Sequence, residues 1–493
     1  MSISSEIAEL WSAGAPVVYL VTAEEDRAVA LCRAAAEGFQ ARVGVWSANR
    51  GLEPQAPTLK DPATVLDALL KLPAPCLLVA LDYHQALATP AVARKLRDLL
   101  PRLAAEGRCL AVVAPRVALP EGLSSDVAVL RLPLPGDEEL GTLLEAAHPA
   151  DATPLTADRR HRAVAAARGL TESQARRAFT RAARRDAALG PDAIAAIAEE
   201  KTRLLERDLG LELVGTPERA DDLGGLATFK AWIAERALAF DADASQYGLP
   251  PPRGVLLVGV QGCGKSLGAK AAAAELRVPI LRLDLPRVLG AQGGAEESLA
   301  RALEATEALA PVALWVDEIE KGFAGSGQGG DPRAARLLGA FSTWLQERKG
   351  PVFVVATAND VSRLPPELLR RGRFDELFFV DLPDLDARRE ILELHLRKRG
   401  RDPAALDVGA IAELCADYSG AELEQVVVGA LHRAFAQKRE LETADLRRLA
   451  QDLVPLFRTY EEQIKALREW ARGRARVAGR SGAIVDLFRR AQG

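Results

Sequence analysis

The sequence contains no long apolar run and no secretion signal. No stretch of about 18 consecutive apolar residues occurs in its 493 residues, so no membrane-spanning helix is expected. The opening residues, MSISSEIAELWSAG, lack both the basic and the apolar region of a signal peptide. The sequence therefore predicts a cytoplasmic protein without a membrane span.

The chain is also poor in cysteine and has little net charge. Its five cysteines are odd in number and widely spaced, and none forms a C-x-x-C pair, which argues against a disulfide framework or a zinc site. A formal net charge of −4 argues against a globally basic nucleic-acid binder. The chain does have 48% apolar residues, enough for sizeable cores, and its length suggests about two to four domains.

Residues 259–266 read GVQGCGKS, which matches the P-loop pattern G-x-x-x-x-G-K-[ST]. Glycines let the backbone turn so that its N–H groups face phosphate oxygens, and the following helix adds partial positive charge. Lys265 is expected to reach the β- and γ-phosphates, and Ser266 to offer a hydroxyl to Mg²⁺. An apolar run at 254–258 and an Ala-rich stretch at 267–276 supply the required strand and helix. A Gly-rich surface turn is the alternative.

Cys263 lies inside this loop. The helix N-terminus that favours phosphate could also lower the pKa of its thiol and make it reactive. The alternative is a small side chain that only fills space.

Two further strand ends carry side chains suited to ATP hydrolysis. The apolar part of PVALWVDEIEKGF (311–323) ends in Asp317 and Glu318. Asp317 suits the Mg²⁺ shell, and Glu318 suits a base that orients or deprotonates the attacking water. The run GPVFVVATAND (350–360) brings Asn359, whose amide would face that water. The alternative is that the two carboxylates only mark an exposed strand end. The P-loop at this spacing along the chain favours the catalytic interpretation instead.

The segment LPPELLRRGRFDE (364–376) holds Arg370, Arg371 and Arg373. Because Lys265 already supplies the cation within one subunit, these arginines suit a neighbour's site, where they would stabilise transition-state charge. A solvated basic turn is the alternative.

The order of these motifs over residues 212–450 resembles the AAA clade of AAA+ ATPases. ADDLGGL (220–226) resembles the opening segment that frames adenine, and YSGAELEQVV (418–427) resembles the lid segment with Gly-Ala in place of a sensor arginine. YGLPPPRGVLLVGVQGCGKS and the tail EEQIKALREWARGRARVA are similar to the tandem AAA proteins encoded in algal plastid genomes, with cyanobacterial and bacterial relatives.

The resemblance implies an ATP hydrolase with ATP and Mg²⁺ as cofactors, and a homo-oligomer, a hexameric ring, that acts on an unidentified protein partner. The implied nucleotide contacts are Asp222, Gly224, Gly259, Gly262, Cys263, Gly264, Lys265, Ser266, Leu267, Gly420 and Ala421. The implied metal ligands are Ser266 and Asp317, and the implied catalytic residues are Glu318, Asn359 and the trans-acting Arg370 and Arg373.

The first half of the chain reads as a degenerate copy of the second. Apolar runs recur in the same order, with offsets of 235 for Asp82 and Asp317, 242 for Val112 and Val354, and 250 for Pro133 and Pro383. The loop VTAEEDRA (21–28) has neither Gly nor Lys, and its three acids would repel phosphate. Tyr83 follows Asp82, so the water-activating Glu is missing. We expect a scaffold that binds no ATP; an unrelated α/β domain is the alternative.

The expected fold is α/β, a P-loop parallel-sheet module with a helical lid, preceded by the degenerate module. The expected parts are the degenerate α/β module at 1–150, its helical segment at 151–210, the ATPase α/β part at 211–385, the lid at 386–455 and a helical tail at 456–493. The tail carries Leu467, Trp470, Ala471 and Arg474 on one helical face and is expected to pack on the lid or on a neighbour, or to be peripheral.

Two segments bear on the partner. Residues 151–190 hold nine arginines against four acids, which is either the solvated face of lid helices or a patch for an anionic partner. In the segment 285–303, Gln292 stands where threading relatives carry an aromatic side chain, which disfavours protein threading. Three functions remain open: remodelling of a protein partner, action on nucleic acid, and a slow nucleotide-gated scaffold.

Overall fold

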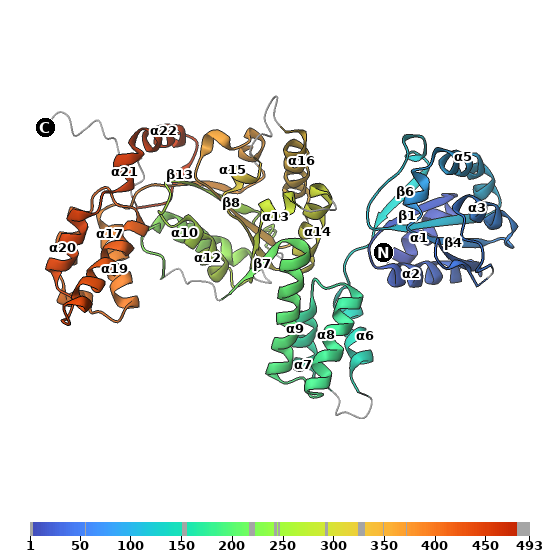
Figure 1. The fold of residues 1–493 in the computed structure, drawn as a ribbon, viewed down its shortest axis with the longest axis horizontal. Helices are drawn as coiled ribbons and strands as arrows, with labels where there is room; N and C mark the ends of the chain where they lie inside the picture. The colour runs from blue at the N-terminus through green and yellow to red at the C-terminus, as the bar shows by residue number, and fades with distance from the viewer. Residues whose placement is uncertain are drawn as a thin grey trace. The chain divides into compact units, whose positions relative to one another are not determined.

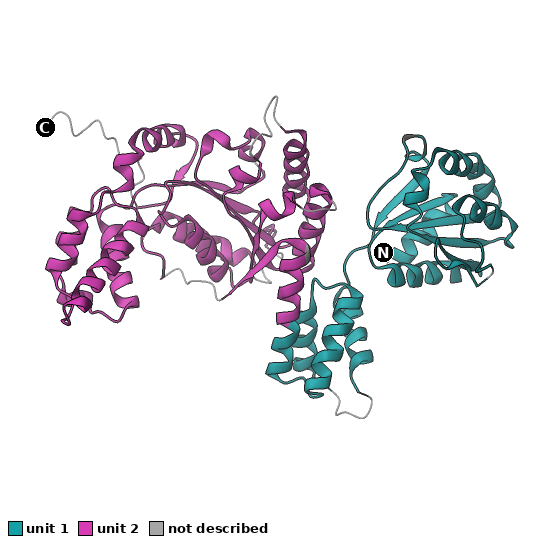
Figure 2. Ribbon diagram, in the orientation of Figure 1, with its two compact units in different colours: residues 1–197 teal, residues 198–493 magenta. Residues whose placement is uncertain are grey.

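The computed structural model divides the chain into two compact units, residues 1–197 and 198–493, which are described one at a time (Figure 2). The structure describes residues 3–54, 56–149, 155–215, 222–240, 244, 247–290, 294–323, 331–348, 350–370 and 372–480. Within these ranges every helix is too short or too polar to cross a lipid bilayer.

The first unit is built on a six-stranded sheet in the order β3-β2-β4-β5-β1-β6. Five strands are parallel, and β3 pairs antiparallel with β2 at the edge. Every residue of β1, β4 and β5 is buried, as expected for parallel strands covered on both faces. The strands are β1 (Val17–Val21), β2 (Arg42–Ser47), β3 (Gly51–Glu53), β4 (Cys76–Leu81), β5 (Arg108–Ala114) and β6 (Val127–Arg131).

Helices cover both faces of this sheet and continue beyond it (Figure 1). One core cluster joins the sheet to α1 (Ile3–Ser12) and α2 (Glu25–Glu37). The other joins it to α3 (Pro62–Lys71), α4 (His84–Leu87) and α5 (Pro90–Ala105). After β6 come α6 (Asp137–Ala147), α7 (Ala157–Ala167), α8 (Glu172–Arg185) and α9 (Pro191–Leu204), and the division between the units falls within α9.

The second unit has a seven-stranded sheet in the order β13-β12-β8-β11-β10-β9-β7. A π-helical turn, η2 (Leu205–Leu209), ends at Gly210 in the left-handed conformation and leads into β7, which pairs antiparallel with β9. The other strands are parallel. They are β7 (Leu211–Val214), β8 (Gly254–Gly259), β9 (Ile280–Leu283), β10 (Val312–Val316), β11 (Val352–Ala358), β12 (Glu376–Val380) and β13 (Arg476–Val477).

The helices of this unit form a sheet-covering set, a separate lid and a tail (Figure 1). The lid helices share their own buried cluster. Near the sheet lie α10 (Ala227–Ala237), α12 (Lys265–Glu275), α13 (Leu285–Leu289), α14 (Ala295–Ala308), α15 (Ile319–Gly322) and α16 (Pro332–Glu347). The lid comprises α17 (Leu385–Lys398), α18 (Val408–Leu414), α19 (Gly420–Ala436) and α20 (Thr443–Asp452), and the tail comprises α21 (Leu456–Thr459), α22 (Glu461–Ala471) and β13.

The two sheets share one strand order. Strands β6-β1-β5-β4-β2 of the first unit follow the same sequence of connections as β12-β8-β11-β10-β9 of the second. The predicted fold class is therefore confirmed, and the shared order favours a duplicated module over an unrelated α/β domain. The predicted domain boundaries stay predictions.

The turn after β1 cannot form a phosphate cradle. Only three residues separate Val21 from Glu25, the start of α2, whereas five separate Gly259 from Lys265 in the second unit. Burial and the carboxylates of Asp82, after β4, and Asp26 raise the pKa of Glu25, so further negative charge is disfavoured here.

The residue of the second unit that corresponds to Asp82 differs from the one expected from the sequence. Asp82 has a left-handed backbone with φ of 54°, and in the second unit it is Glu318, not Asp317, that has such a backbone, with φ of 47°. Backbone conformation therefore aligns Asp82 with Glu318, one position away from the alignment expected from the sequence.

A buried ion-pair network stands at the α2 end of this turn. The Arg27 guanidinium, 8% exposed, pairs with Glu24 at 3.0 Å and with Glu139 of α6 at 2.8 Å, and it donates to the carbonyl of Pro133. Glu24 also accepts the backbone N–H of Glu172 at the start of α8, at 2.5 Å. Protein side chains therefore tie this loop to the helices that follow β6.

We predict that Arg27→Met loosens α6 and α8. The substitution leaves Glu24 buried without its cation, which should cost about 3 kcal/mol and speed amide exchange in these helices by roughly 100-fold. Hydrogen exchange followed by mass spectrometry measures this. The matched control is Arg168→Met, which removes a more exposed pair with Asp137 and should cost less than about 1 kcal/mol. Equal exchange in both variants, or protection of these helices by ATP, would contradict the prediction.

Candidate nucleotide site

The P-loop leaves β8 at Gly259 and enters α12 at Lys265. Gly262 and Gly264 have φ of 76° and 93°, a left-handed backbone that favours glycine. A Cβ on Gly262 would lie 3.1 Å from the Ser419 hydroxyl, and Ala421 N–H donates to the Gly262 carbonyl at 3.0 Å. The loop therefore makes its predicted turn and touches the lid directly.

The Lys265 side chain is buried inside this loop. Its ammonium donates to the carbonyls of Gly259 at 2.9 Å and Val260 at 2.8 Å. Burial lowers the pKa of Lys265 to about 8, because water is excluded from the charged form. A phosphate beside the ammonium would favour the charged form again.

Oxygen donors from three elements meet where a metal ion is expected. The Ser266 hydroxyl lies 3.5 Å from Oδ1 of Asp317, and the Thr357 hydroxyl donates to the same oxygen at 2.6 Å. Arg282 of β9 lies 3.8 Å from the other carboxylate oxygen. A hydroxyl and a carboxylate are ligands that Mg²⁺ accepts together with phosphate oxygens, so these residues fit the implied ion.

Glu318 and Asn359 are brought together as predicted. Oε1 of Glu318 accepts from the Asn359 side-chain amide at 2.8 Å, and Oε2 pairs with Lys321 at 2.5 Å. The Glu318 N–H donates to the Thr357 hydroxyl at 3.0 Å, which helps to hold its left-handed backbone. Such a conformation in a non-glycine residue costs free energy and is common at functional sites.

Two residues that hold the site residues in place were not predicted from the sequence. Thr357 is the one hydroxyl in the apolar strand VFVVATA, and it bonds to both carboxylate residues of the site. Glu320, 2% exposed, accepts the N–H of Asn359 at 3.0 Å, and burial raises its pKa. A single polar residue in a buried strand was a usable signal for Thr357, whereas nothing in the sequence marks Glu320 as buried.

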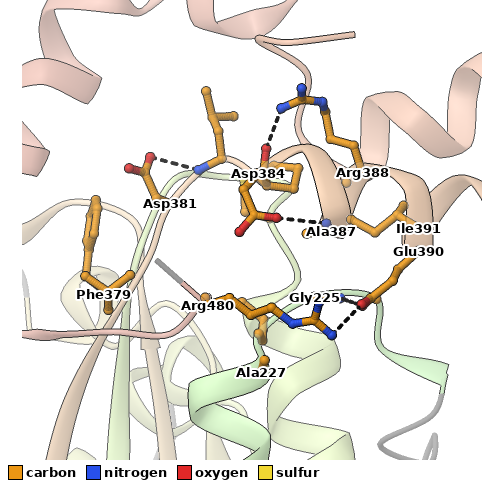
Figure 3. Close-up of a pocket in the computed structure, with 18 of the residues that line it drawn as sticks. Gly225, Ala227, Phe379, Asp381, Asp384, Ala387, Arg388, Glu390, Ile391 and Arg480 are labelled. Atoms are coloured by element: carbon orange, nitrogen blue, oxygen red, sulfur yellow. Dashed lines mark hydrogen bonds and ion pairs between the residues drawn. The ribbon is translucent and has the colours of Figure 1, made fainter. Parts of the chain in front are cut away.

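A cavity of about 260 Å³ lies at the other end of the P-loop, between the sheet, the lid and the tail (Figure 3). Gly224 and Gly225 of the opening segment, Cys263 of the loop, and Ile391 and Gly420 of the lid line it. Gly224, Cys263 and Gly420, which are predicted nucleotide contacts from three separate segments, thus line one cavity.

Cys263 does not have the reactive thiol that the helix N-terminus could have produced. The side chain is buried, and burial raises the pKa of its thiol to about 12. The helix N-terminus is therefore outweighed by the loss of solvation, and the space-filling alternative holds.

Two other predicted nucleotide contacts, Asp222 and Leu267, do not line this cavity. Asp222 pairs with Lys398 at 3.7 Å and is absent from the cavity lining, and Leu267 is half-buried in the first turn of α12. Their nucleotide roles stay predictions. Gln292 and Arg371 lie outside the described residues.

The two remaining predicted residues are Arg370 and Arg373. Arg370 is exposed, and Arg373 is half-buried with its Nε lacking a partner among the described residues. Within those residues neither makes a hydrogen bond or ion pair with Asp317, Glu318 or Asn359. Their trans-acting role stays a prediction.

Three family models match the chain. The SpoVK-like AAA ATPase N-terminal domain matches residues 3–132, the SpoVK-like second domain matches 137–208, and the model for AAA, the ATPase family associated with various cellular activities, matches 255–382. The P-loop and the strand ends that carry Asp317, Glu318 and Asn359 lie within the last range.

Relatives match over almost the whole chain. The AAA domain-containing protein ycf46 of Guillardia theta is 35% identical over 489 residues, 97% of each chain, and that of Trieres chinensis is 33% identical over 97% of this chain and 98% of its own. The proteasome-activating nucleotidase of Pyrococcus horikoshii is 33% identical over 48% of this chain and 61% of its own length. The predicted resemblance is therefore confirmed: the chain belongs to the ycf46 family of AAA ATPases.

Proposed function

We propose that the chain binds ATP with Mg²⁺ at this site and hydrolyses it. The observation that carries the proposal is the convergence of Lys265, Asp317, Glu318 and Asn359 at the carboxyl ends of neighbouring parallel strands. In this proposal Lys265 holds the β- and γ-phosphates, and Ser266 and Asp317 hold the ion. The ion would neutralise charge on the phosphate oxygens during transfer.

In this proposal the Glu318–Asn359 pair positions and activates the attacking water. The Asn359 amide fixes Oε1 of Glu318, so the carboxylate can orient the water and accept its proton. Thr357 holds both the Glu318 backbone and the Asp317 carboxylate, which keeps metal ligand and base at a fixed separation. In this proposal the cation and one metal ligand follow β8, the second metal ligand and the base follow β10, and the amide of Asn359 follows β11.

We further propose that the active form is a homo-oligomeric ring, a hexamer, that remodels a protein partner. Arg370 and Arg373 are directed to no group of their own unit's site, which suits completion of a neighbour's site. The nucleotidase that matches 48% of the chain is proteasome-activating according to its name, which supports a protein as the partner class. The first unit, whose loop lacks a phosphate cradle, would serve as scaffold.

We predict that Glu318→Gln binds ATP but turns it over about 10²–10⁴-fold more slowly. The amide keeps the side chain's shape and cannot accept the proton. Phosphate release and the affinity for a fluorescent ATP analogue are measured together. Glu296→Gln, which alters an exposed pair with Arg336, is the control and should retain normal turnover. Lys265→Ala should lose binding itself. Normal turnover in Glu318→Gln would assign the base elsewhere.

We predict that Arg373→Ala binds ATP and loses hydrolysis by about 10³-fold or more. Mixing it with Lys265→Ala should restore part of the activity, because an intact arginine from one variant can serve the intact P-loop of the other. Phosphate release is measured across mixing ratios, with mixed oligomers verified by differently tagged chains. If such mixed oligomers form without any activity, the shared site is wrong.

Action on nucleic acid remains as a second candidate because of α8. The exposed residues of this helix are Ser173 and five arginines, with no apolar side chain among them. A protein interface usually needs buried apolar or aromatic anchors, whereas phosphate needs only cations. The five arginines are Arg176, Arg177, Arg181, Arg184 and Arg185.

The arginines of α7 and α8 differ in their pairing. Those of α7 and its end mostly meet acids, namely Arg160 with Glu145, Arg162 with Asp158, and Arg168 with Asp137. On α8, Arg176 pairs with Glu172, but Arg177, Arg184 and Arg185 meet no acid among the described residues. The solvated-face interpretation therefore suits α7, and the anionic-partner interpretation suits α8.

We predict, under this second candidate, that changing Arg177, Arg184 and Arg185 to Glu abolishes binding of a 20-nucleotide single-stranded RNA. Wild-type binding should weaken with salt, with a log–log slope of about −0.7 for each phosphate contact. Fluorescence anisotropy over a salt series measures both. The control changes Arg447 and Arg448 of α20 to Glu. Wild-type binding to polyglutamate but not RNA would assign an acidic protein instead, and binding to neither would reject the candidate.

A further inference from the structure

The C-terminal tail does not pack on the lid alone, as one expectation had it, but joins the sheet. Strand β13 pairs in parallel with β12, and Ile464, Leu467 and Ala471 of α22 are buried. The side chains of Arg468, Val477 and Arg480 line the same cavity as Gly224 and Gly420. The tail is therefore a wall of this cavity, in which the proposed nucleotide would place its base.

The tail's first anchor lies next to the P-loop. Arg468 of α22 donates two-pronged bonds to Asp381 at 2.9–3.0 Å, and the two side chains are 11% and 14% exposed. Asp381 directly follows Val380, whose carbonyl accepts the N–H of Val260 in the P-loop at 2.9 Å. The tail's ion pair is therefore made by the residue next to the one whose carbonyl bonds to the P-loop.

Its second anchor caps helix α10. Leu226, before this helix, offers no side-chain cap, which leaves the first N–H groups without an intrahelical acceptor. The fully buried Ala478 supplies it: its carbonyl accepts from Thr228 N–H at 3.0 Å and Phe229 N–H at 3.2 Å. The residues just before this helix, Gly224 to Leu226, line the cavity, so the tail fixes the segment that faces the base.

Its third anchor reaches the lid. Arg480 lies 3.2 Å from Glu390 of α17 (Figure 3). It also lies 3.6 Å from Asp386 of the same helix. The other carboxylate oxygen of Glu390 accepts the N–H of Gly225 at 2.9 Å. A chain of contacts therefore runs from the tail through a lid carboxylate to the backbone of the opening segment.

We infer that residues 476–480 are a positioning element for the nucleotide base, and that Arg480 acts through Glu390 to hold Gly225 and α17 on either side of it. The inference rests on the proposed nucleotide binding and adds a requirement to it. Arg480 lies at the base end, whereas Lys265, Asp317 and Glu318 lie at the phosphate end. Loss of Arg480 should therefore weaken binding of the base and leave the chemical step unchanged.

Arg480→Ala tests this with the full chain. The pair with Glu390 is exposed, so the KM for ATP and the Kd for ADP should rise about two- to fivefold, with kcat within twofold. Competition by inorganic tripolyphosphate, which has no base, should be unchanged. Arg480→Lys should recover part of the affinity, because it keeps the cation. Arg472→Ala is the matched control: Arg472 belongs to the tail but precedes residues 476–480, and its exposed side chain pairs with Glu469 of α22.

Truncation of the tail provides a second, independent test. A chain ended after Ala475 loses β13 and the cap of α10 and should bind ADP at least about tenfold more weakly, while a chain ended after Arg480 should bind normally. Thermal unfolding of each variant separates weak binding from a failure to fold. If wild-type protein binds no ATP, the proposed function fails. If it binds ATP and Arg480→Ala matches it in KM and Kd, or loses tripolyphosphate binding equally, the inference alone is overturned.

Discussion

The site depends on one constraint, the parallel strand order that places β8 between β11 and β12, and β11 between β8 and β10. Parallel strands in this order present their carboxyl ends at one edge, so residues nearly 100 positions apart meet there. Lys265 follows β8, Asp317 and Glu318 follow β10, and Asn359 follows β11. Each of these side chains would be an ordinary surface group elsewhere, and the sheet order makes them one site.

The first unit shows that the strand order is necessary without being sufficient. Its sheet has the same connections, but the turn after β1 is two residues shorter, and the backbone N–H groups cannot surround a phosphate. An arginine held by two glutamates stands beside that turn instead. A nucleotide in the second unit could be released, whereas the side chains of Arg27, Glu24 and Glu139 cannot leave. The second unit could therefore change its conformation as nucleotide binds and leaves, whereas the first unit would keep one conformation.

The sequence predicted the parts of the site that local patterns encode. The P-loop, the acidic strand end and Asn359 each follow a recognisable apolar run, and the fold class followed from their order. The sequence could not predict contacts between segments that are far apart in the chain. The roles of Thr357 and Glu320 appear only when β10 and β11 lie side by side, and the pKa of Cys263 depends on burial by neighbouring segments. The tail looked like a weakly amphipathic helix, because its partners lie far away in the chain, such as Asp381 for Arg468, and because one anchor is the backbone carbonyl of Ala478.

The tail also bears on how hydrolysis could move the lid. The lid touches the P-loop through the Ala421 N–H bond to Gly262, and it touches the opening segment through Glu390 and Gly225. Arg480 joins this second contact to a strand of the sheet, so a lid movement that opens the cavity must break or carry along the exposed Arg480 pair. The Arg468–Asp381 pair is nearly buried and is more costly to break. The tail therefore has a fixed end on the sheet and a weaker end on the lid, and movement of α17 should concentrate at the weaker end.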